Sequence, residues 1–142
     1  MPISLSDQLP PVRTPVRALR DRQVRQAMTR GFMGHCPNCG RGKLLRNYLK
    51  VVDNCSVCGE DFSHQRADDA PPYFTILIVG HLIVPLMFFI EIEYSPSLLL
   101  SMIGWPALTA LCCVALLPRI KGAVVGMQWA MRMHGFGGPT ID

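Results

Sequence analysis

The apolar residues of this chain are concentrated in its second half, in two long runs separated by a short polar segment. The first run, YFTILIVGHLIVPLMFFI at residues 73–90, has no charged residue and would reach about 27 Å as a helix. The second run, LLLSMIGWPALTALCCVALL at residues 98–117, would reach about 30 Å. Because the hydrocarbon layer of a bilayer is about 30 Å thick, the pattern predicts two spanning helices, at about 73–92 and 98–117. The intervening EIEYSPS would join them, so that residues 68–118 form a transmembrane helical hairpin.

A helical stripe of apolar residues follows the second run. Its members recur at intervals of four, three and four residues: Ile120, Val124, Met127 and Met131. The segment is too short and too charged to cross the bilayer. We expect residues 119–142 to form an amphipathic helix that lies in the headgroup plane, with Trp129 at the interface, followed by a tail. The alternative is that the stripe packs against the protein's own polar head.

The chain begins with a basic segment, residues 1–30, which we interpret as a flexible or helical arm. Prolines oppose regular structure at its start, whereas Thr14 and Pro15 are typical of a helix start and Gly31 of a helix stop. We interpret its charged residues as a solvated face. The alternative is attraction to anionic lipid headgroups, about 1 kcal/mol per basic residue near the surface. Nucleic acid is disfavoured as a partner because the arm lacks interleaved aromatic residues that stack on bases.

The distribution of charge predicts how the hairpin is oriented. Eleven of the fourteen Lys and Arg residues lie within residues 1–72, and none lies within residues 73–117. The loop of the hairpin carries Glu91 and Glu93 without a cation. Cations flank the two spans instead: Arg66, Arg119 and Lys121. Because positive charge is retained on the cytoplasmic side, we expect both termini in the cytosol. The first thirty residues show no apolar core of a secretory signal, which agrees with a cytosolic head.

Four cysteines of the head have the C-x2-C-x15-C-x2-C spacing of a metal site. They are Cys36, Cys39, Cys55 and Cys58. This spacing predicts one structural zinc ion per chain in a small zinc ribbon of short β-hairpins at residues 31–67. A site of four thiolates leaves no open position for water or substrate, which disfavours metal catalysis. A redox dithiol is the alternative. Tyr48 and Val51 are candidates for the small core of the ribbon.

Polar residues also lie at the junction with the first span and inside it. Asp68 and Asp69 precede the point, near Pro72, where we expect the helix to begin. We interpret them as a cap on this helix, and partner docking or cation binding is the alternative. His81 lies about 12 Å into the span, where an ionisable group is costly. We expect it to hydrogen-bond Thr109 across the hairpin; the alternative is contact with a cofactor or with a partner's helix.

The second span contains an adjacent pair of cysteines, Cys112 and Cys113. Together with Met87 and Met102 they are soft donors that would suit copper(I) or haem iron. Adjacent residues point to different faces of a helix, however, so one ion does not readily take both thiols. We therefore favour the interpretation that these cysteines are small apolar residues.

Four separated blocks of the sequence resemble a known family. They are CPNCGRGKLL, CSVCGEDF, RADDAPPYFTILIVGH and LLPRIKGAVVGMQWAMRMHG. In order and content they are similar to a bacterial family of membrane proteins, mainly alphaproteobacterial, that is catalogued as domain of unknown function 983. The resemblance covers about residues 30–135 and implies no catalytic residues. Members are often encoded near haem–copper oxidase and oxidase-assembly genes, which implies a respiratory context.

These observations favour a non-enzymatic zinc-ribbon adaptor of the bacterial inner membrane. Its expected partner is an integral membrane complex, and the family resemblance implies a respiratory one such as cytochrome c oxidase during assembly. The first alternative is a protein that handles metal or haem through His81, Cys112 and Cys113. The second is a membrane-tethered regulator that binds nucleic acid through residues 1–30. An enzyme is the least favoured class, because no nucleophile with a base, open metal site or phosphate loop is visible.

Overall fold

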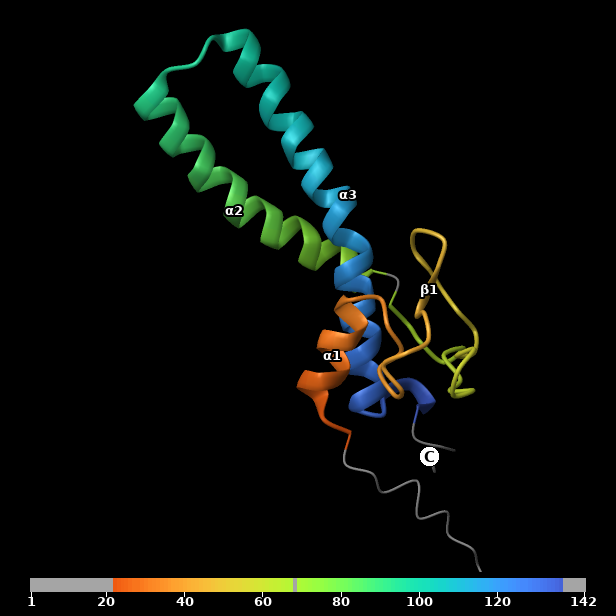
Figure 1. Ribbon diagram of the computed structural model, residues 1–142. Coiled ribbons are helices and arrows are strands. Elements are labelled where there is room, and N and C mark those ends of the chain that lie inside the picture. The colour runs from red at the N-terminus through yellow and green to blue at the C-terminus, as the bar shows by residue number, and fades with distance from the viewer. Residues whose placement is uncertain (1–21, 68, 137–142) are drawn as a thin grey trace, which may run out of the picture.

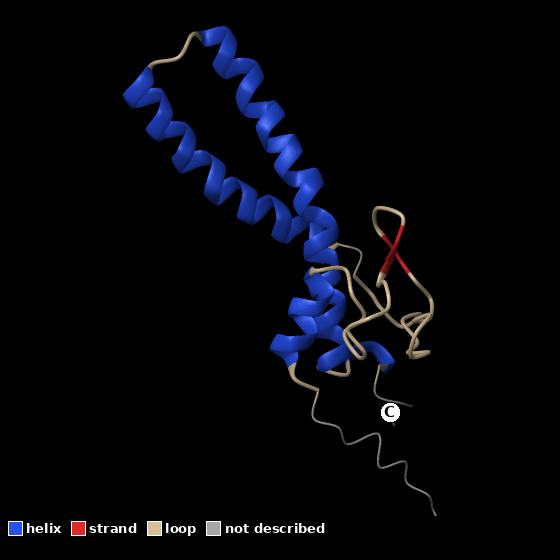
Figure 2. Ribbon diagram, viewed as in Figure 1, coloured by secondary structure: helices blue, strands red, loops and turns tan. Residues whose placement is uncertain are grey.

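The computed structural model describes residues 22–67 and 69–136. Its elements, in chain order, are helix α1 (Val24–Phe32), strands β1 (Leu45–Arg46) and β2 (Lys50–Val51), helices α2 (Ala70–Tyr94) and α3 (Leu98–Ala130), and the short 3₁₀ helix η3 (Met133–Gly135). Two parts are evident in Figures 1 and 2. The apolar hairpin, residues 70–118, consists of α2 and the first part of α3. The head, residues 22–67 and 119–136, packs around the last part of α3.

Both helices of the apolar hairpin are long and apolar enough to cross a membrane, as the two apolar runs predict. The most apolar 18-residue stretch of α2 is 11% buried inside the protein, and that of α3 is 0% buried. A core helix of a water-soluble domain would be covered over much of its surface. At the tip, the Glu91 carboxylate accepts hydrogen bonds from Ser101 at 2.5 Å and Trp105 at 2.9 Å, which tie the two helices together. The outer surface of the hairpin therefore suits lipid better than water.

The segment after the second apolar run continues α3 and does not form a separate helix. α3 has 33 residues and passes through Pro118 without ending. Ile120 and Val124 of the predicted stripe are buried in the head. Trp129 is only 7% exposed and donates from Nε1 to the Glu60 carboxylate at 2.7 Å. The prediction of an interfacial helix with Trp129 at the lipid surface is therefore wrong for residues 119–130. The first half of the stripe packs against the head, whereas Met131 at its end is 57% exposed.

The head part of α3 packs directly on α1 because small residues face each other at two contacts. A Cβ atom added to Gly122 would lie 2.0 Å from the carbonyl oxygen of Gly31. One added to Gly126 would lie 2.4 Å from the carbonyl oxygen of Ala27. The two backbones therefore touch, and no side chain fits at either glycine of α3 unless the helices move apart.

The N-terminal arm is described only in its last part. α1 begins at Val24, and the predicted helix start at Thr14 and Pro15 lies outside the described residues. The predicted stop at Gly31 is wrong, because α1 continues to Phe32. Gly31 sits inside the helix because its missing side chain allows the close approach of α3.

Strands β1 and β2 form a small antiparallel hairpin (Figure 1), and the side chain of Tyr48 in its loop contacts α3. Val51 is 6% exposed, which confirms it as a core residue. Tyr48, predicted for the same core, is 46% exposed, and its hydroxyl instead donates to the carbonyl of Val114 in α3. In a regular helix that carbonyl would accept from the N–H four residues later, but the residue there is Pro118, which has none. Tyr48 thus satisfies an acceptor that the proline leaves open.

Removing the Tyr48 hydroxyl tests this contact. We expect Tyr48→Phe to lower the free energy of unfolding in detergent by about 1 to 2 kcal/mol, because the Val114 carbonyl loses its partner. In a Pro118→Ala background the same change is expected to cost much less, because the new backbone N–H at position 118 reaches that carbonyl. Tyr73→Phe, which alters an exposed ring on α2, serves as the control. Equal losses from Tyr48→Phe in both backgrounds would contradict the assignment.

Candidate metal centre

Two turns with the same backbone pattern present the four cysteines. We call them the first knuckle, residues 36–40, and the second knuckle, residues 55–59. In the first, the N–H of Gly40 donates to the carbonyl of Cys36 at 2.8 Å; in the second, the N–H of Gly59 donates to that of Cys55 at 2.9 Å. Both glycines have positive φ, 70° and 72°, which glycine adopts without strain. The Cys-x-x-Cys-Gly pattern therefore turns the chain so that both thiols of each pair converge.

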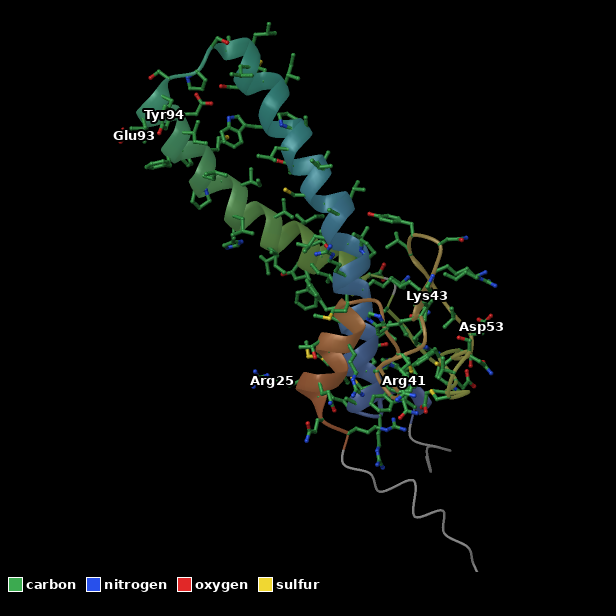
Figure 3. The ribbon with its side chains drawn as sticks, viewed as in Figure 1. Arg25, Arg41, Lys43, Asp53, Glu93 and Tyr94 are labelled. Atoms are coloured by element: carbon green, nitrogen blue, oxygen red, sulfur yellow. The ribbon has the colours of Figure 1, made fainter. Side chains whose placement is uncertain are left out.

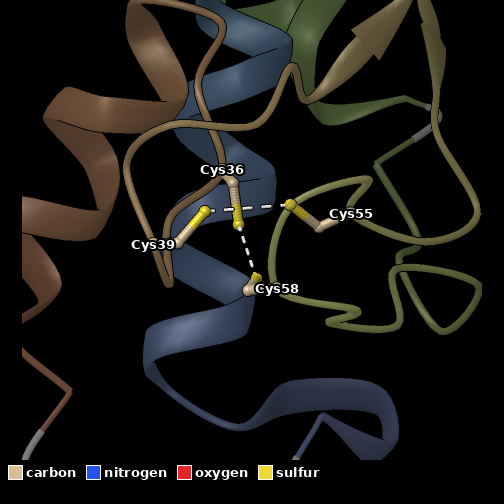
Figure 4. A group of neighbouring side chains, drawn as sticks. All are labelled: Cys36, Cys39, Cys55 and Cys58. Carbon is tan, nitrogen blue, oxygen red and sulfur yellow. Dashed lines mark hydrogen bonds between the residues drawn. The ribbon is translucent and has the colours of Figure 1, made fainter.

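The four sulfurs form one compact cluster (Figure 4). All four Sγ atoms lie within 4.8 Å of one another. The Cys36–Cys58 pair is separated by 3.7 Å and the Cys39–Cys55 pair by 3.8 Å, each pair joining the two knuckles. These distances are far longer than the roughly 2 Å of a disulfide. A tetrahedron of sulfurs placed about 2.3 Å from a zinc ion has edges of about 3.8 Å. The donor set and its spacing therefore fit a tetrahedral thiolate metal such as zinc.

The surroundings of the cluster shift the pKa values of individual thiols in opposite directions. Burial raises the pKa of Cys36 and, less strongly, that of Cys58. Burial also acts to raise the pKa of Cys39, but the backbone N–H groups of Gly42 and Arg41 and two neighbouring thiols outweigh it and hold that pKa at about 6. These surroundings favour the thiolate form of Cys39, the form that ligates metal. The fully buried Cys36 thiol needs a nearby cation to become a thiolate in turn.

Residues outside the Cys spacing shape the cluster. A Cβ atom on Gly42 would lie 2.4 Å from the sulfur of Cys55, so only glycine lets the backbone pass this close. Arg30 of α1 donates to the carbonyls of Pro37 and Asn38 at 3.1 and 3.0 Å, which fixes the first knuckle to the helix. The sequence gives no indication that Arg30 contacts the first knuckle. Gly42, the second glycine of CGRG, could have been recognised from the sequence as a residue that lets the backbone approach the cysteines closely.

Glu60 connects the knuckles to the end of α3. Its carboxylate accepts hydrogen bonds from Asn38 at 2.9 Å and from Trp129 at 2.7 Å, and it lies 3.7 Å from the guanidinium of Arg22. The guanidinium stacks over the Trp129 ring, 4.3 Å from its centroid, and donates to the carbonyls of Trp129 and Phe136. Partial burial lowers the pKa of Arg22, while the Glu60 carboxylate acts in the opposite direction. The metal centre is thus tied to the helix that continues into the apolar hairpin.

Of the two junction carboxylates, Asp69 is not part of the metal centre. Asp68 lies outside the described residues. Asp69 is exposed and occupies the N-cap position of α2, which begins at Ala70, two residues before the predicted Pro72. Its side chain makes no capping hydrogen bond, because its backbone has helical angles (φ −96°, ψ −27°) where a capping residue is extended.

The predicted His81–Thr109 hydrogen bond is not formed. His81 is exposed on α2, and its Nδ1 atom lies 2.7 Å from the carbonyl of Leu77. The hydroxyl of Thr109 donates to the carbonyl of Trp105 at 2.8 Å. Each side chain therefore bonds the carbonyl four residues earlier in its own helix, which is the nearest acceptor available.

The adjacent cysteines of the second apolar run do not join a metal-binding group among the described residues. Cys112 and Cys113 are half-buried free thiols in α3. Within residues 22–67 and 69–136, the four head cysteines are the one group of three or more Cys, His, Asp or Glu side chains placed to hold an ion. His81, Cys112 and Cys113 are thus not brought together in the part of the chain that the structure describes.

Residues 45–129 match the family described as "Protein of unknown function (DUF983)". That range is more than half of the 142-residue chain. The chain belongs to the DUF983 family. The matched range contains the β-hairpin, the second knuckle, α2 and all of α3 except Ala130, and it ends at Trp129. The family resemblance inferred from the sequence blocks is thereby confirmed, over a shorter range than the predicted 30–135. The first knuckle of this DUF983 protein, with Cys36 and Cys39, precedes the matched range.

No curated protein and no solved structure is similar enough to this DUF983 chain to count as a match.

Proposed function

We propose that this DUF983 protein is a non-enzymatic adaptor of the bacterial inner membrane, with a zinc-bearing cytosolic head on a two-span anchor. The continuity of α3 carries the proposal. One unbroken helix supplies the second apolar run and then the residues on which the head packs, including the buried Val125 and Trp129. α3 continues through Pro118, and the Tyr48 hydroxyl bonds the Val114 carbonyl that this proline leaves open, so the head would be held in one orientation relative to the bilayer.

The chemistry of the metal centre supports a structural role for zinc. Four thiolates would fill the coordination sphere, so the ion would stabilise the head without activating water or substrate. The head has a small core, and metal binding would supply folding free energy that such a core lacks. Zinc would therefore stabilise the folded head, and the head would present the surface that binds a partner.

The charges support a cytosolic head. Glu93 and Tyr94 lie at the far tip of the hairpin from Lys43, which belongs to the head (Figure 3). All Lys and Arg residues of the chain lie outside residues 73–117, so the tip has no cation. The positive-inside tendency then places the head and both termini in the cytosol.

We further propose an integral membrane complex as the partner, with a respiratory oxidase as the first to test. The apolar outer faces of α2 and α3 are uncovered by the described chain and would be available to other spanning helices. The gene neighbourhood implied by the family resemblance is the reason to begin with cytochrome c oxidase.

Affinity purification from the native host tests this proposal. The tagged chain would be extracted in mild detergent, and co-purifying proteins would be identified by mass spectrometry. We expect one set of integral membrane subunits with the wild type and with Cys112→Ser, and its loss with Cys36→Ser/Cys55→Ser. Absence of any enriched membrane complex would contradict the adaptor. After gene deletion, unchanged haem a spectra and oxidase activity would contradict the oxidase assignment alone.

One observation favours a second candidate, a protein that handles metal or haem. His81 is exposed on α2, and because its Nδ1 atom contacts the Leu77 carbonyl, Nε2 is the ring nitrogen that would ligate a metal. Metal analysis of the purified protein separates the two candidates. Zinc near one per chain without copper or haem agrees with the adaptor, whereas a second metal that is lost in His81→Ala agrees with the carrier.

A further inference from the structure

A groove opens where the head meets the apolar hairpin. We call it the interfacial groove; it encloses about 420 Å³ and is lined by Phe32, Met33, Gly34, Leu45, Pro118 and Arg119. Three segments far apart in the sequence therefore contribute: the end of α1, strand β1 and the middle of α3. The volume lies within the range of roughly 300–1,000 Å³ that is typical of small-molecule sites.

The position of the groove along α3 corresponds to a membrane boundary. Pro118 is the last uncharged residue before Arg119, and Arg119 is the first cation after residues 73–117, which have none. An arginine directly after an apolar span lies at the level of the lipid phosphates. The groove therefore lies at headgroup depth if the apolar hairpin crosses the bilayer as proposed above.

The head extends apolar side chains to this level. Met33 is 74% exposed and Phe32 is 39% exposed, both at the end of α1 that points toward the hairpin (Figure 1). The loop between β1 and β2 also reaches this depth, because the Tyr48 hydroxyl bonds the Val114 carbonyl, four residues inside Pro118. Exposed Met, Phe and Tyr side chains at one level are typical of a surface that contacts the boundary between headgroups and acyl chains.

The charge of this surface complements an anionic headgroup. Arg119 is exposed at the groove, and the adjoining segment carries three more cations: Lys43, Arg46 and Lys50. None of these four forms a salt bridge in the described part of the chain. A guanidinium matches the geometry of a phosphate and binds it through two parallel hydrogen bonds.

From these observations we infer that the interfacial groove binds one anionic phospholipid of the surrounding bilayer. Arg119 holds the phosphate, and Phe32, Met33, Leu45 and Pro118 contact the glycerol end of the acyl chains. The inference rests on the proposed membrane insertion. It assigns lipid recognition to the folded head, separately from any attraction of residues 1–30. A bound lipid would fill the space between α1, β1 and α3 and stabilise the docked position of the head.

Photo-crosslinking of the full chain in nanodiscs tests the inference. The nanodiscs would contain phosphatidylglycerol and phosphatidylcholine in equal parts. Benzoylphenylalanine would replace Met33 in the groove, Phe88 on the outer face of α2, or Val57 on the second knuckle. Both controls are exposed apolar residues, at 60% and 55%, and Figure 1 shows the second knuckle on the side of the head away from the hairpin.

We expect phospholipid adducts at positions 33 and 88 and none at position 57. At position 33, phosphatidylglycerol adducts should exceed phosphatidylcholine adducts about fivefold, the ratio that one cation near an anionic surface provides. Arg119→Gln should bring this ratio close to one, whereas Arg41→Gln, an exposed cation of the head outside the groove, should leave it unchanged. Position 88 should show no headgroup preference.

Three results would overturn the inference. Adducts at position 88 without any at position 33 would support the proposed membrane insertion but exclude a lipid site in the groove. Crosslinks from position 33 to a second copy or to another protein would also exclude a lipid site in the groove. A phosphatidylglycerol preference that persists in Arg119→Gln would exclude Arg119 as the group that binds the phosphate. Absence of lipid adducts at position 88 would instead contradict the proposed membrane insertion, and with it the lipid site that depends on that insertion.

Discussion

Replacing Cys36 and Cys55 with serine is expected to abolish metal binding and unfold the head, while α2 and the apolar part of α3 stay helical in detergent. The double change removes one ligand from each knuckle and one sulfur from each of the two close pairs. Structural zinc provides about 10–16 kcal/mol in small metal domains at neutral pH. The free energy supplied by zinc is thus as large as the free energy of unfolding of a whole domain, about 5–15 kcal/mol, and the small core of the head cannot replace it.

Zinc analysis and limited proteolysis of the purified protein check this prediction. The wild type should carry zinc and resist cleavage within residues 22–67, and a strong chelator should make it as sensitive as the double variant. Cys112→Ser/Cys113→Ser removes two thiols that lie outside the cluster, so zinc content and protease resistance should be unchanged. A head that resists protease equally well without its thiols would show that the metal centre does not hold the fold.

Gly122→Ala is expected to produce the second largest effect, by separating α1 from α3. The added methyl group would lie 2.0 Å from the Gly31 carbonyl oxygen, which belongs to the backbone and cannot rotate away. Overpacking of a core by a single group costs about 1–3 kcal/mol, and we expect the upper part of this range or more because the obstacle is backbone. The loss should be visible as a lower unfolding midpoint of the head in detergent.

Gly104→Ala in the same helix is the matched control, because nothing lies within 4 Å of a Cβ atom added there. Alanine is favoured over glycine inside a helix by up to about 1 kcal/mol, so this control should be neutral or slightly stabilising. Gly126→Ala should resemble Gly122→Ala, since its Cβ would lie 2.4 Å from the Ala27 carbonyl. Equal behaviour of Gly122→Ala and Gly104→Ala would contradict the close packing of α1 on α3.

The features that sequence could predict are those fixed by local spacing. Two residues between cysteines and a following glycine define each knuckle, and the resulting sulfur cluster is confirmed. The two apolar runs are long enough that any helix containing them could cross a membrane, which the lengths of α2 and α3 confirm. In both cases the determining residues are neighbours in the chain, so no knowledge of tertiary packing is needed.

The features that sequence could not predict depend on which surfaces meet. An apolar stripe at Ile120 and Val124 has the same spacing whether it faces lipid or protein, and only the complementary surface of α1 decides between them. The His81–Thr109 prediction failed because matching depths in two helices do not bring side chains together when each can bond its own backbone. The Tyr48 contact joins residues 66 positions apart, although Pro118 does indicate that the Val114 carbonyl needs a partner.

We propose that a single ion held by four sulfurs fixes the head to the helix that continues into the apolar hairpin. X-ray absorption at the zinc edge of protein purified from membranes would show whether it does. We expect about one zinc per chain with a first shell of four sulfurs at about 2.3 Å. A folded protein without zinc, or a zinc shell that contains nitrogen or oxygen ligands in place of any of the four thiolates, would contradict it.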